Sequence, residues 1–149
     1  RYGKTEISED AVKKAAEVAQ ATEFIDTKPE RYKTPIAQGG SNVSGGQKQR
    51  LSIARAIAKD PEIFIFDDSF SALDFKTDST LRKALKEHTK EATTIIVAQR
   101  ISTILNADKI LVMEHGNIVE QGTHQELLEL NGVYARLYNA QFLSKSSNM

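Results

Sequence analysis

The sequence contains no cysteine, and this absence excludes several kinds of chemistry. Without a thiol there is no disulfide, no thiolate nucleophile and no cysteine-ligated zinc site. Long hydrophobic runs are also missing, because the longest apolar stretches, Ile63–Phe66 and Ile95–Ala98, are far shorter than a membrane span. No signal peptide is visible. The first residue is Arg1 and not Met, so we expect the chain to be cut from a longer protein.

Neither sign of charge is in excess. Lys and Arg total 20, and Asp and Glu total 20, so the formal net charge is zero. A protein that binds nucleic acid through its phosphates needs a surplus of positive charge, and we therefore expect no nucleic-acid partner. Hydrophobic residues make up 40% of the 149 residues, which is too many for a disordered chain. One globular domain, or a large piece of one, is the expected organisation.

The middle of the chain predicts alternating helices and strands. Apolar runs over 63–66 and 93–98 have the pattern of strands that are buried on both faces of a parallel sheet. Helical spacing of apolar residues predicts helices over about 44–58 and 77–88. A strand, a helix and a second strand in this order imply a parallel crossover, so the predicted fold class is α/β.

Helices and a hairpin are expected on either side of this region. A helix that begins at Ser8 precedes a loop over 26–43, which is rich in proline and glycine. The elements expected after the second strand are a short helix over 101–106, a β-hairpin of 110–113 and 118–121, a helix opened by Thr123 and ended by Gly132, and a last helix over 133–142.

A glycine-rich segment lies at the start of the helix predicted from residue 44. Ser44 and Gln47 have the spacing of a capping box. Free N–H groups at a helix start favour an anion, and glycines at positions 45 and 46 let a phosphate approach the backbone. From these residues alone, a phosphate site and an ordinary capped helix are equally good interpretations.

The string Val43–Ala56 resembles the signature motif of the ATP-binding cassette (ABC) ATPases, with Val43 in the place of the usual leucine. The resemblance implies a P-loop NTPase fold and ATP as the cofactor. In that family the motif does not contact the ATP of its own subunit but the ATP held by a second nucleotide-binding domain, across a dimer interface. On this resemblance, the residues that contact the partner's ATP are Ser44, Gly45, Gly46 and Gln47.

Two aspartates follow the first predicted strand. Asp67 and Asp68 lie at the carboxyl edge of the predicted sheet, where α/β proteins bind ligands. They resemble the Walker B region, in which Asp67 would hold Mg²⁺ and the next residue, usually Glu, orients or deprotonates the attacking water. Because Asp68 is one methylene shorter than Glu, we expect a weakened catalytic carboxylate. The alternative is that Asp68 only caps the following turn.

Two further segments resemble family motifs. Ser71 and Asp74 fall in a stretch that resembles the D-loop, which lines the dimer interface, although Asp74 also suits an ordinary helix cap. Gln99 stands where the family usually has a histidine that contacts the γ-phosphate. Gln can donate a hydrogen bond, but it cannot hold a proton near neutral pH.

Asp68 and Gln99 depart from the family pattern together, as in the degenerate-site subunit of heterodimeric exporters. We therefore expect slow hydrolysis at this chain's own site. The partner's site, which residues 43–47 would complete, could be fully active.

A P-loop is missing from the sequence. Gly3-Lys4-Thr5 matches only the end of the P-loop pattern and no strand precedes it, so we interpret it as a chance match. The resemblance thus implies the C-terminal part of one nucleotide-binding domain that lacks its Walker A half. Its expected parts are a helical signature subdomain over about 1–58, a portion of the RecA-like core over about 59–142, and a frayed tail over 143–149.

The hypothesis from the sequence is an ATP-hydrolysing component of an ABC exporter at the cytoplasmic face of the cell membrane. Its expected partners are a second, different nucleotide-binding domain and a membrane-spanning domain. The segment alone is expected to be soluble and inactive. One alternative is a soluble ABC ATPase of DNA repair or translation. The other is a non-hydrolysing module that uses nucleotide only for dimerisation, which Asp68 and Gln99 favour slightly.

Overall fold

The computed structural model describes residues 6–142 and contains two compact units, the first ending at Ile95 and the second beginning at Ile96. The boundary expected near residue 58 stays a prediction. The Gly3–Thr5 match and the expected tail over 143–149 lie outside the described residues. Within residues 6–142, no helix combines the length and the apolar character needed to cross a membrane.

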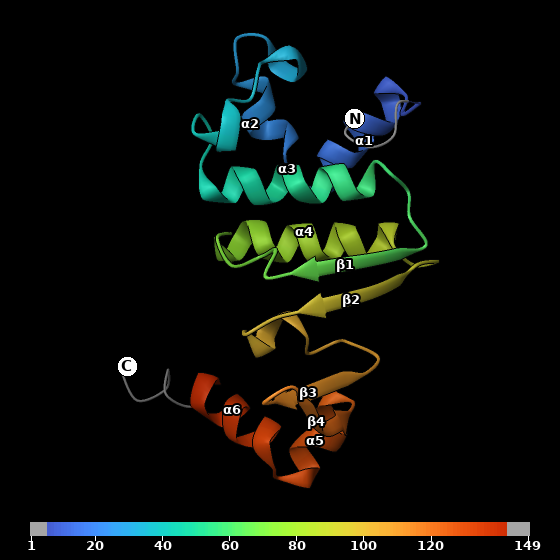
Figure 1. The fold of residues 1–149 in the computed structure, drawn as a ribbon, viewed down its shortest axis with the longest axis vertical. Coiled ribbons are helices and arrows are strands. Elements are labelled where there is room, and N and C mark those ends of the chain that lie inside the picture. Colours follow the sequence, from blue (N-terminus) through green and yellow to red (C-terminus); the bar gives the residue numbers. More distant parts are fainter. Residues whose placement is uncertain (1–5, 143–149) are drawn as a thin grey trace. The chain divides into compact units, whose positions relative to one another are not determined.

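The first unit holds the helices and strands that precede residue 96 (Figure 1). Strand β2 spans the division between the units. The elements up to and including β2 are α1 (Glu9–Val18), α2 (Thr22–Asp26), the 3₁₀ turns η1 (Arg31–Lys33) and η2 (Gln38–Gly40), α3 (Gly45–Ile57), β1 (Ile63–Asp67), α4 (Phe75–His88) and β2 (Thr93–Val97).

Helix α1 packs against α3. The Ser8 hydroxyl caps α1 by accepting a hydrogen bond from the Ala11 N–H at 3.1 Å, as expected. The chain leaves α1 through Gln20, whose φ of 57° is in the left-handed region. Arg50 of α3 donates to the Gln20 carbonyl at 2.7 Å and lies 4.9 Å from the centre of the Phe24 ring. The guanidinium of Arg50 therefore contacts groups inside this unit.

Strand β1 is covered on one face only. Phe64 and Phe66 are buried, and their rings stack with centres 5.8 Å apart. Ile63 and Ile65 point to the other face and remain 57% and 68% exposed. The expectation that this strand is buried on both faces is wrong for this chain, because no element of the described residues covers the isoleucine face.

Strands β1 and β2 form a two-stranded sheet. Figure 1 shows the two arrows running in the same direction, and α4 connects them along the chain. The Thr93 N–H donates to the Glu62 carbonyl at 2.9 Å, which fixes where β2 begins beside β1. The predicted parallel α/β arrangement is confirmed. As a result, the carboxyl end of β1 and the turn that follows it lie at one edge of the sheet.

The second unit continues from Ile96. Its elements after β2 are the 3₁₀ turn η3 (Ile101–Thr103), β3 (Ile110–Glu114), β4 (Asn117–Gly122), α5 (His124–Leu130) and α6 (Val133–Phe142). β3 and β4 form the predicted antiparallel hairpin. The buried side chains of its core are Ile101, Ile110, Val112, Leu127 and Tyr134.

Residues with positive φ mark the hairpin loop and the end of helix α5 in the second unit. The hairpin loop is shorter than expected, because Asn117 pairs with Glu114 and leaves only His115 and Gly116 between the strands. Both loop residues have positive φ, as a two-residue hairpin turn requires. Helix α5 is closed by Asn131 in the left-handed conformation, one residue before the glycine that was expected to end it.

Candidate nucleotide-contact site

The start of α3 has the capping box that the sequence predicts. The Ser44 Oγ accepts from the Gln47 N–H at 3.2 Å, and the Gln47 Oε1 accepts from the Ser44 N–H at 3.1 Å. Ser44 is exposed and Gln47 half-buried. Because these bonds use the side-chain oxygens as acceptors, the Ser44 O–H and the Gln47 NH₂ remain available as donors within the described residues. The helix start can therefore offer hydrogen bonds and its dipole to an anion.

The two glycines after Ser44 lie beside the turn that connects β1 to α4, residues 68–74, called the β1–α4 turn below. A Cβ on Gly46 would be 3.0 Å from the Ala72 carbonyl oxygen, which is too close for an ordinary contact. A Cβ on Gly45 would be 3.7 Å from the Ala72 Cβ, an ordinary distance. Gly46 thus lets the helix start approach the turn, whereas Gly45 is exposed and has room.

Gln49 joins the same helix to the same turn, which the sequence did not reveal. Its Nε2 donates to the Asp68 carbonyl at 3.1 Å and to the Ser71 Oγ at 3.0 Å. Its Oε1 accepts from the Ala72 N–H at 3.0 Å. One side chain therefore fixes three groups of the β1–α4 turn. No spacing rule marks such a residue, because its partners are 19 to 23 positions away in the sequence.

Asp67 ends β1, and Asp68 begins the β1–α4 turn. Both are exposed. Asp68 has a φ of 47°, a left-handed conformation that Asp and Asn adopt more readily than most residues. Its carbonyl also accepts from the Ser71 hydroxyl at 3.2 Å. The backbone of Asp68 is thus held by two side chains, while its carboxylate faces solvent.

Asp67 offers one exposed carboxylate as a ligand for Mg²⁺. No three His, Asp or Glu side chains within residues 6–142 lie together as a metal cluster. Mg²⁺ often takes one or two protein carboxylates and completes its octahedron with phosphate oxygens and water. A single exposed carboxylate at a strand end fits this pattern, so Asp67 could be one ligand of a magnesium ion that a nucleotide largely holds.

Asp74 is the N-cap of α4, so the prediction of an ordinary helix cap is confirmed. Its Oδ2 accepts from the Thr77 Oγ1 at 2.6 Å and its Oδ1 from the Thr77 N–H at 3.0 Å. The Thr77 hydroxyl bond and then the backbone bond hold the pKa of Asp74 below the ordinary value of an aspartate. This side chain is therefore already engaged inside the chain, and a contact to a partner's nucleotide stays a prediction for it.

Gln99 follows β2 in the second unit and is exposed. Its backbone carbonyl accepts from the Nε2 of Gln141 at 2.8 Å. The structure brings the signature residues, Gln49 and the β1–α4 turn together within the first unit. The expected meeting of Gln99 with the two aspartates stays a prediction.

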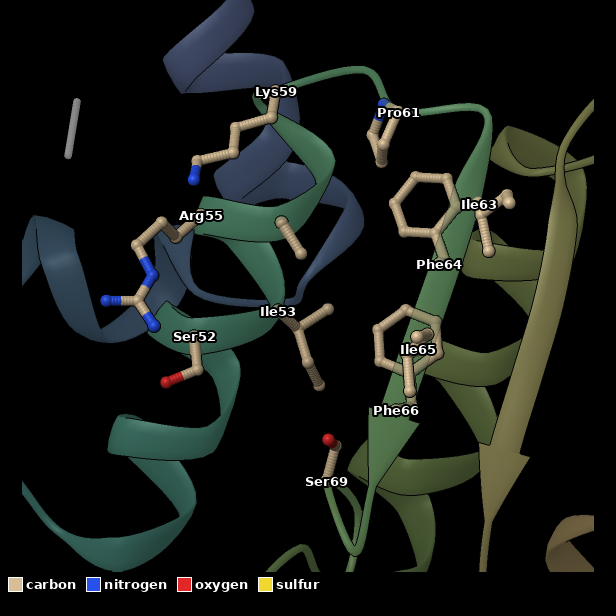
Figure 2. Close-up of a pocket in the computed structure, with 11 residues that line it drawn as sticks. Ser52, Ile53, Arg55, Lys59, Pro61, Ile63, Phe64, Ile65, Phe66 and Ser69 are labelled. Atoms are coloured by element: carbon tan, nitrogen blue, oxygen red, sulfur yellow. The ribbon is translucent and has the colours of Figure 1, made fainter. Parts of the chain in front are cut away.

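A hollow of about 350 Å³ between α3 and β1 is distinct from this cluster. Figure 2 shows Ile53 pointing toward Phe64 and Phe66 across the hollow, whereas Arg55 and Lys59 leave α3 on the side away from β1. None of the predicted site residues lines it. The hollow is a gap in the packing between α3 and β1. The candidate site is instead the exposed start of α3.

Comparison with known proteins identifies the family. Residues 2–71 match the model of the ABC transporter family. The chain is 53% identical over 130 residues to the leptomycin B resistance protein pmd1 of Schizosaccharomyces pombe. It is 48% identical over 140 residues to an ATP-dependent lipid A-core flippase of Legionella pneumophila. These matches cover 87% and 94% of this chain, but only 10% and 24% of the relatives.

A solved structure agrees with these relatives. The fold superposes on a bacterial Atm1-family ABC exporter with ATP bound, with a TM-score of 0.90 and 38% sequence identity over 95% of this chain. The chain spans 25% of that exporter's length. The chain belongs to the ABC transporter family and is part of a nucleotide-binding domain of the exporter type.

Proposed function

We propose that this chain is the C-terminal part of a nucleotide-binding domain in a longer ABC exporter, called the parent below. The parent would bind and hydrolyse ATP at the cytoplasmic face of the membrane, together with a membrane-spanning domain and a second nucleotide-binding domain. The observation that carries the proposal is the exposed start of α3, where a capping box fixes the backbone and leaves donors for a phosphate.

Ser44, Gly45, Gly46 and Gln47 would act on the ATP of the second domain. Two properties of the helix start support this role. The Ser44 O–H and Gln47 NH₂ can donate to the terminal phosphate while the oxygens of these side chains keep the helix capped. Gly45 has no side chain to block a close approach and is exposed to solvent.

Ser71 and Asp74 lie in the β1–α4 turn and at its end, beside the same helix start. Gln49 holds Ser71 against α3. Both residues are exposed, so they could reach across the dimer interface when the two domains close. A partner that is a different subunit would explain why this chain keeps the signature while its own catalytic positions are altered.

The remaining site residues would serve the parent's own ATP. Bound Mg²⁺ would neutralise phosphate charge, and Asp67 would supply one oxygen ligand to it. Asp68 would orient the attacking water, but its carboxylate falls short of the position that a glutamate reaches. Gln99 would donate a hydrogen bond to the terminal phosphate without carrying a proton. The proposed result is slow hydrolysis at this site.

The experiment for the trans role uses two serine-to-aspartate variants of the parent. Ser44→Asp keeps a good N-cap residue but places a negative charge where the partner's phosphate is proposed to bind. Ser8→Asp makes the same change at the N-cap of α1 and is the matched control. We expect Ser44→Asp to lower ATP hydrolysis at the partner's site at least tenfold and Ser8→Asp to leave it unchanged. Equal activity of the two variants would contradict the proposal.

A further inference from the structure

Gln141 of α6 forms a two-point hydrogen bond with the chain just after β2. Its Nε2 donates to the Gln99 carbonyl at 2.8 Å, and its Oε1 accepts from the Ile101 N–H at 2.9 Å. Donor and acceptor of one side-chain amide are thus both used on one short stretch, residues 99–101, called the post-β2 segment below. The two bonds restrict both the position and the orientation of this backbone.

Helix α6, which carries Gln141, is packed into the core of the second unit. Tyr134 is 2% exposed and lies in the core of the second unit, and its hydroxyl is 2.8 Å from the Nδ1 of His124. The rings of Tyr138 and Phe142 stack with centres 4.6 Å apart. Positions 134, 138 and 141 follow the i, i+4, i+7 spacing of one helix face. Gln141 therefore projects from the face that is anchored in the core.

The far end of the post-β2 segment is also anchored. Ile101 is 5% exposed and belongs to the same core as Tyr134. Gln99 itself is exposed, so its side chain has no core packing to hold it. The bond from Gln141 to the Gln99 carbonyl thus fixes the backbone of a residue that packing leaves free. Gln141 stands 42 residues from Gln99 in the sequence.

We propose that Gln141 is a positioning residue, which holds the post-β2 segment so that the side chain at position 99 is presented to the terminal phosphate of ATP. The inference rests on the proposed function of Gln99. Gln141 acts through the backbone and does not itself touch nucleotide. The same contact would position a histidine at 99 equally well, because only main-chain atoms of that residue are used. Misplacement of a catalytic group by about 1 Å can lower a rate by up to about 100-fold.

The first measurement is hydrogen exchange of the parent, followed on peptides that contain residues 99–103. Gln141→Met keeps the length and helix preference of the side chain but removes both hydrogen bonds. Gln141→Glu keeps an acceptor for the Ile101 N–H and loses the donor to the Gln99 carbonyl. We expect exchange to rise in Gln141→Met and to rise less in Gln141→Glu. Gln125→Met is the control, because Gln125 is exposed and its amide donates to the exposed Glu129 of the same helix.

The second measurement is ATP turnover in a parent that carries Asp68→Glu and Gln99→His, the changes expected to speed its own site. Adding Gln141→Met should lower that gain in kcat about tenfold and leave KM for ATP within about twofold, since nucleotide binding is not touched. When Gln141→Glu is added in place of Gln141→Met, part of the gain should remain. When Gln125→Met is added instead, all of the gain should remain. A merely structural role of Gln141 would lower the yield or thermal stability and leave kcat per folded molecule unchanged.

The outcomes separate this inference from the proposed function. Unchanged exchange in Gln141→Met overturns the inference, and so does raised exchange with an unchanged kcat. If Asp68→Glu and Gln99→His give no gain in turnover while Gln141 is intact, the proposed role of positions 68 and 99 fails instead. The exchange measurement then still decides whether Gln141 holds the post-β2 segment.

Discussion

The side-chain amide of Gln49 donates to the carbonyl of Asp68 at 3.1 Å, and this contact ties helix α3 to the first residue of the β1–α4 turn. The same side chain accepts from the Ala72 N–H at 3.0 Å. Residues that are proposed to serve two different ATP molecules are therefore joined through one glutamine. These contacts hold α3 and the β1–α4 turn against each other within the first unit.

Replacement of Gln49 by Met should loosen the β1–α4 turn. The variant loses three hydrogen bonds, so we expect a loss of about 1–3 kcal/mol in the free energy of unfolding. Urea denaturation of the 149-residue chain measures the loss, and Gln125→Met is the matched control at an exposed position. A loss equal to that of the control would show that Gln49 does not hold the turn.

The two signature glycines should respond differently to alanine. Gly46→Ala places a Cβ 3.0 Å from the Ala72 carbonyl oxygen, which forces the turn to shift, and we expect a loss of about 1–3 kcal/mol. Gly45→Ala has room, and alanine favours a helix over glycine, so a gain of up to about 1 kcal/mol is expected. Thermal unfolding of both variants tests this. The opposite order of stability would mean that the helix start does not lie against Ala72.

Acid should weaken the cap of α4. Hydrogen bonds from Thr77 lower the pKa of Asp74 in the folded state, so the ionised carboxylate stabilises the fold above about pH 4. This contribution is lost as the pH falls through the lowered pKa. Asp74→Asn keeps an N-cap acceptor that does not titrate.

We therefore expect the stability of the natural chain relative to Asp74→Asn to fall below about pH 4. Urea midpoints from pH 7 to pH 2 measure it. A difference that is constant over this range would rule out the linkage, because other acidic groups titrate in both chains and cancel.

The altered catalytic positions should respond to restoration. Asp68→Glu together with Gln99→His in the parent, with the partner's site disabled, should raise turnover at least tenfold, on the scale of general-base contributions of about 10²–10⁴. Asp68→Asn tolerates the same left-handed φ of 47° and lacks the carboxylate, so it should fold normally and show no gain. Steady-state ATPase assays compare the three proteins. No gain on restoration would contradict the degenerate-site interpretation.

Local rules predicted much of this fold. Ser44 with Gln47 and Thr123 with Glu126 both form the capping boxes that their spacing indicates, because such bonds depend only on residues three apart. The hairpin and the parallel strand pair follow from short apolar runs and turn residues. The exposed start of α3 is consistent with the resemblance, which implies that residues 44–47 contact the ATP of a second domain.

Contacts that depend on the tertiary fold escaped sequence reasoning. Gln49 and Gln141 resemble ordinary surface glutamines in the sequence, yet their partners lie about 20 and 40 residues away. The left-handed backbone of Asp68 was not foreseen, because nothing in its neighbours demands it. The exposed face of β1 was not predicted. An apolar run shows that a strand is suited to burial on both faces, but it does not show whether this chain supplies an element to cover each face.

The most direct test of the central claim uses the absence of cysteine from these 149 residues. Ser44→Cys introduces a single thiol into the segment at the proposed phosphate contact, and its alkylation by a maleimide can be followed by mass spectrometry of the peptide. We expect ATP to protect this thiol only when the second nucleotide-binding domain is present. Equal labelling with and without ATP in the assembled parent, or protection by ATP without the partner domain, would contradict the claim that this helix start binds the partner's nucleotide.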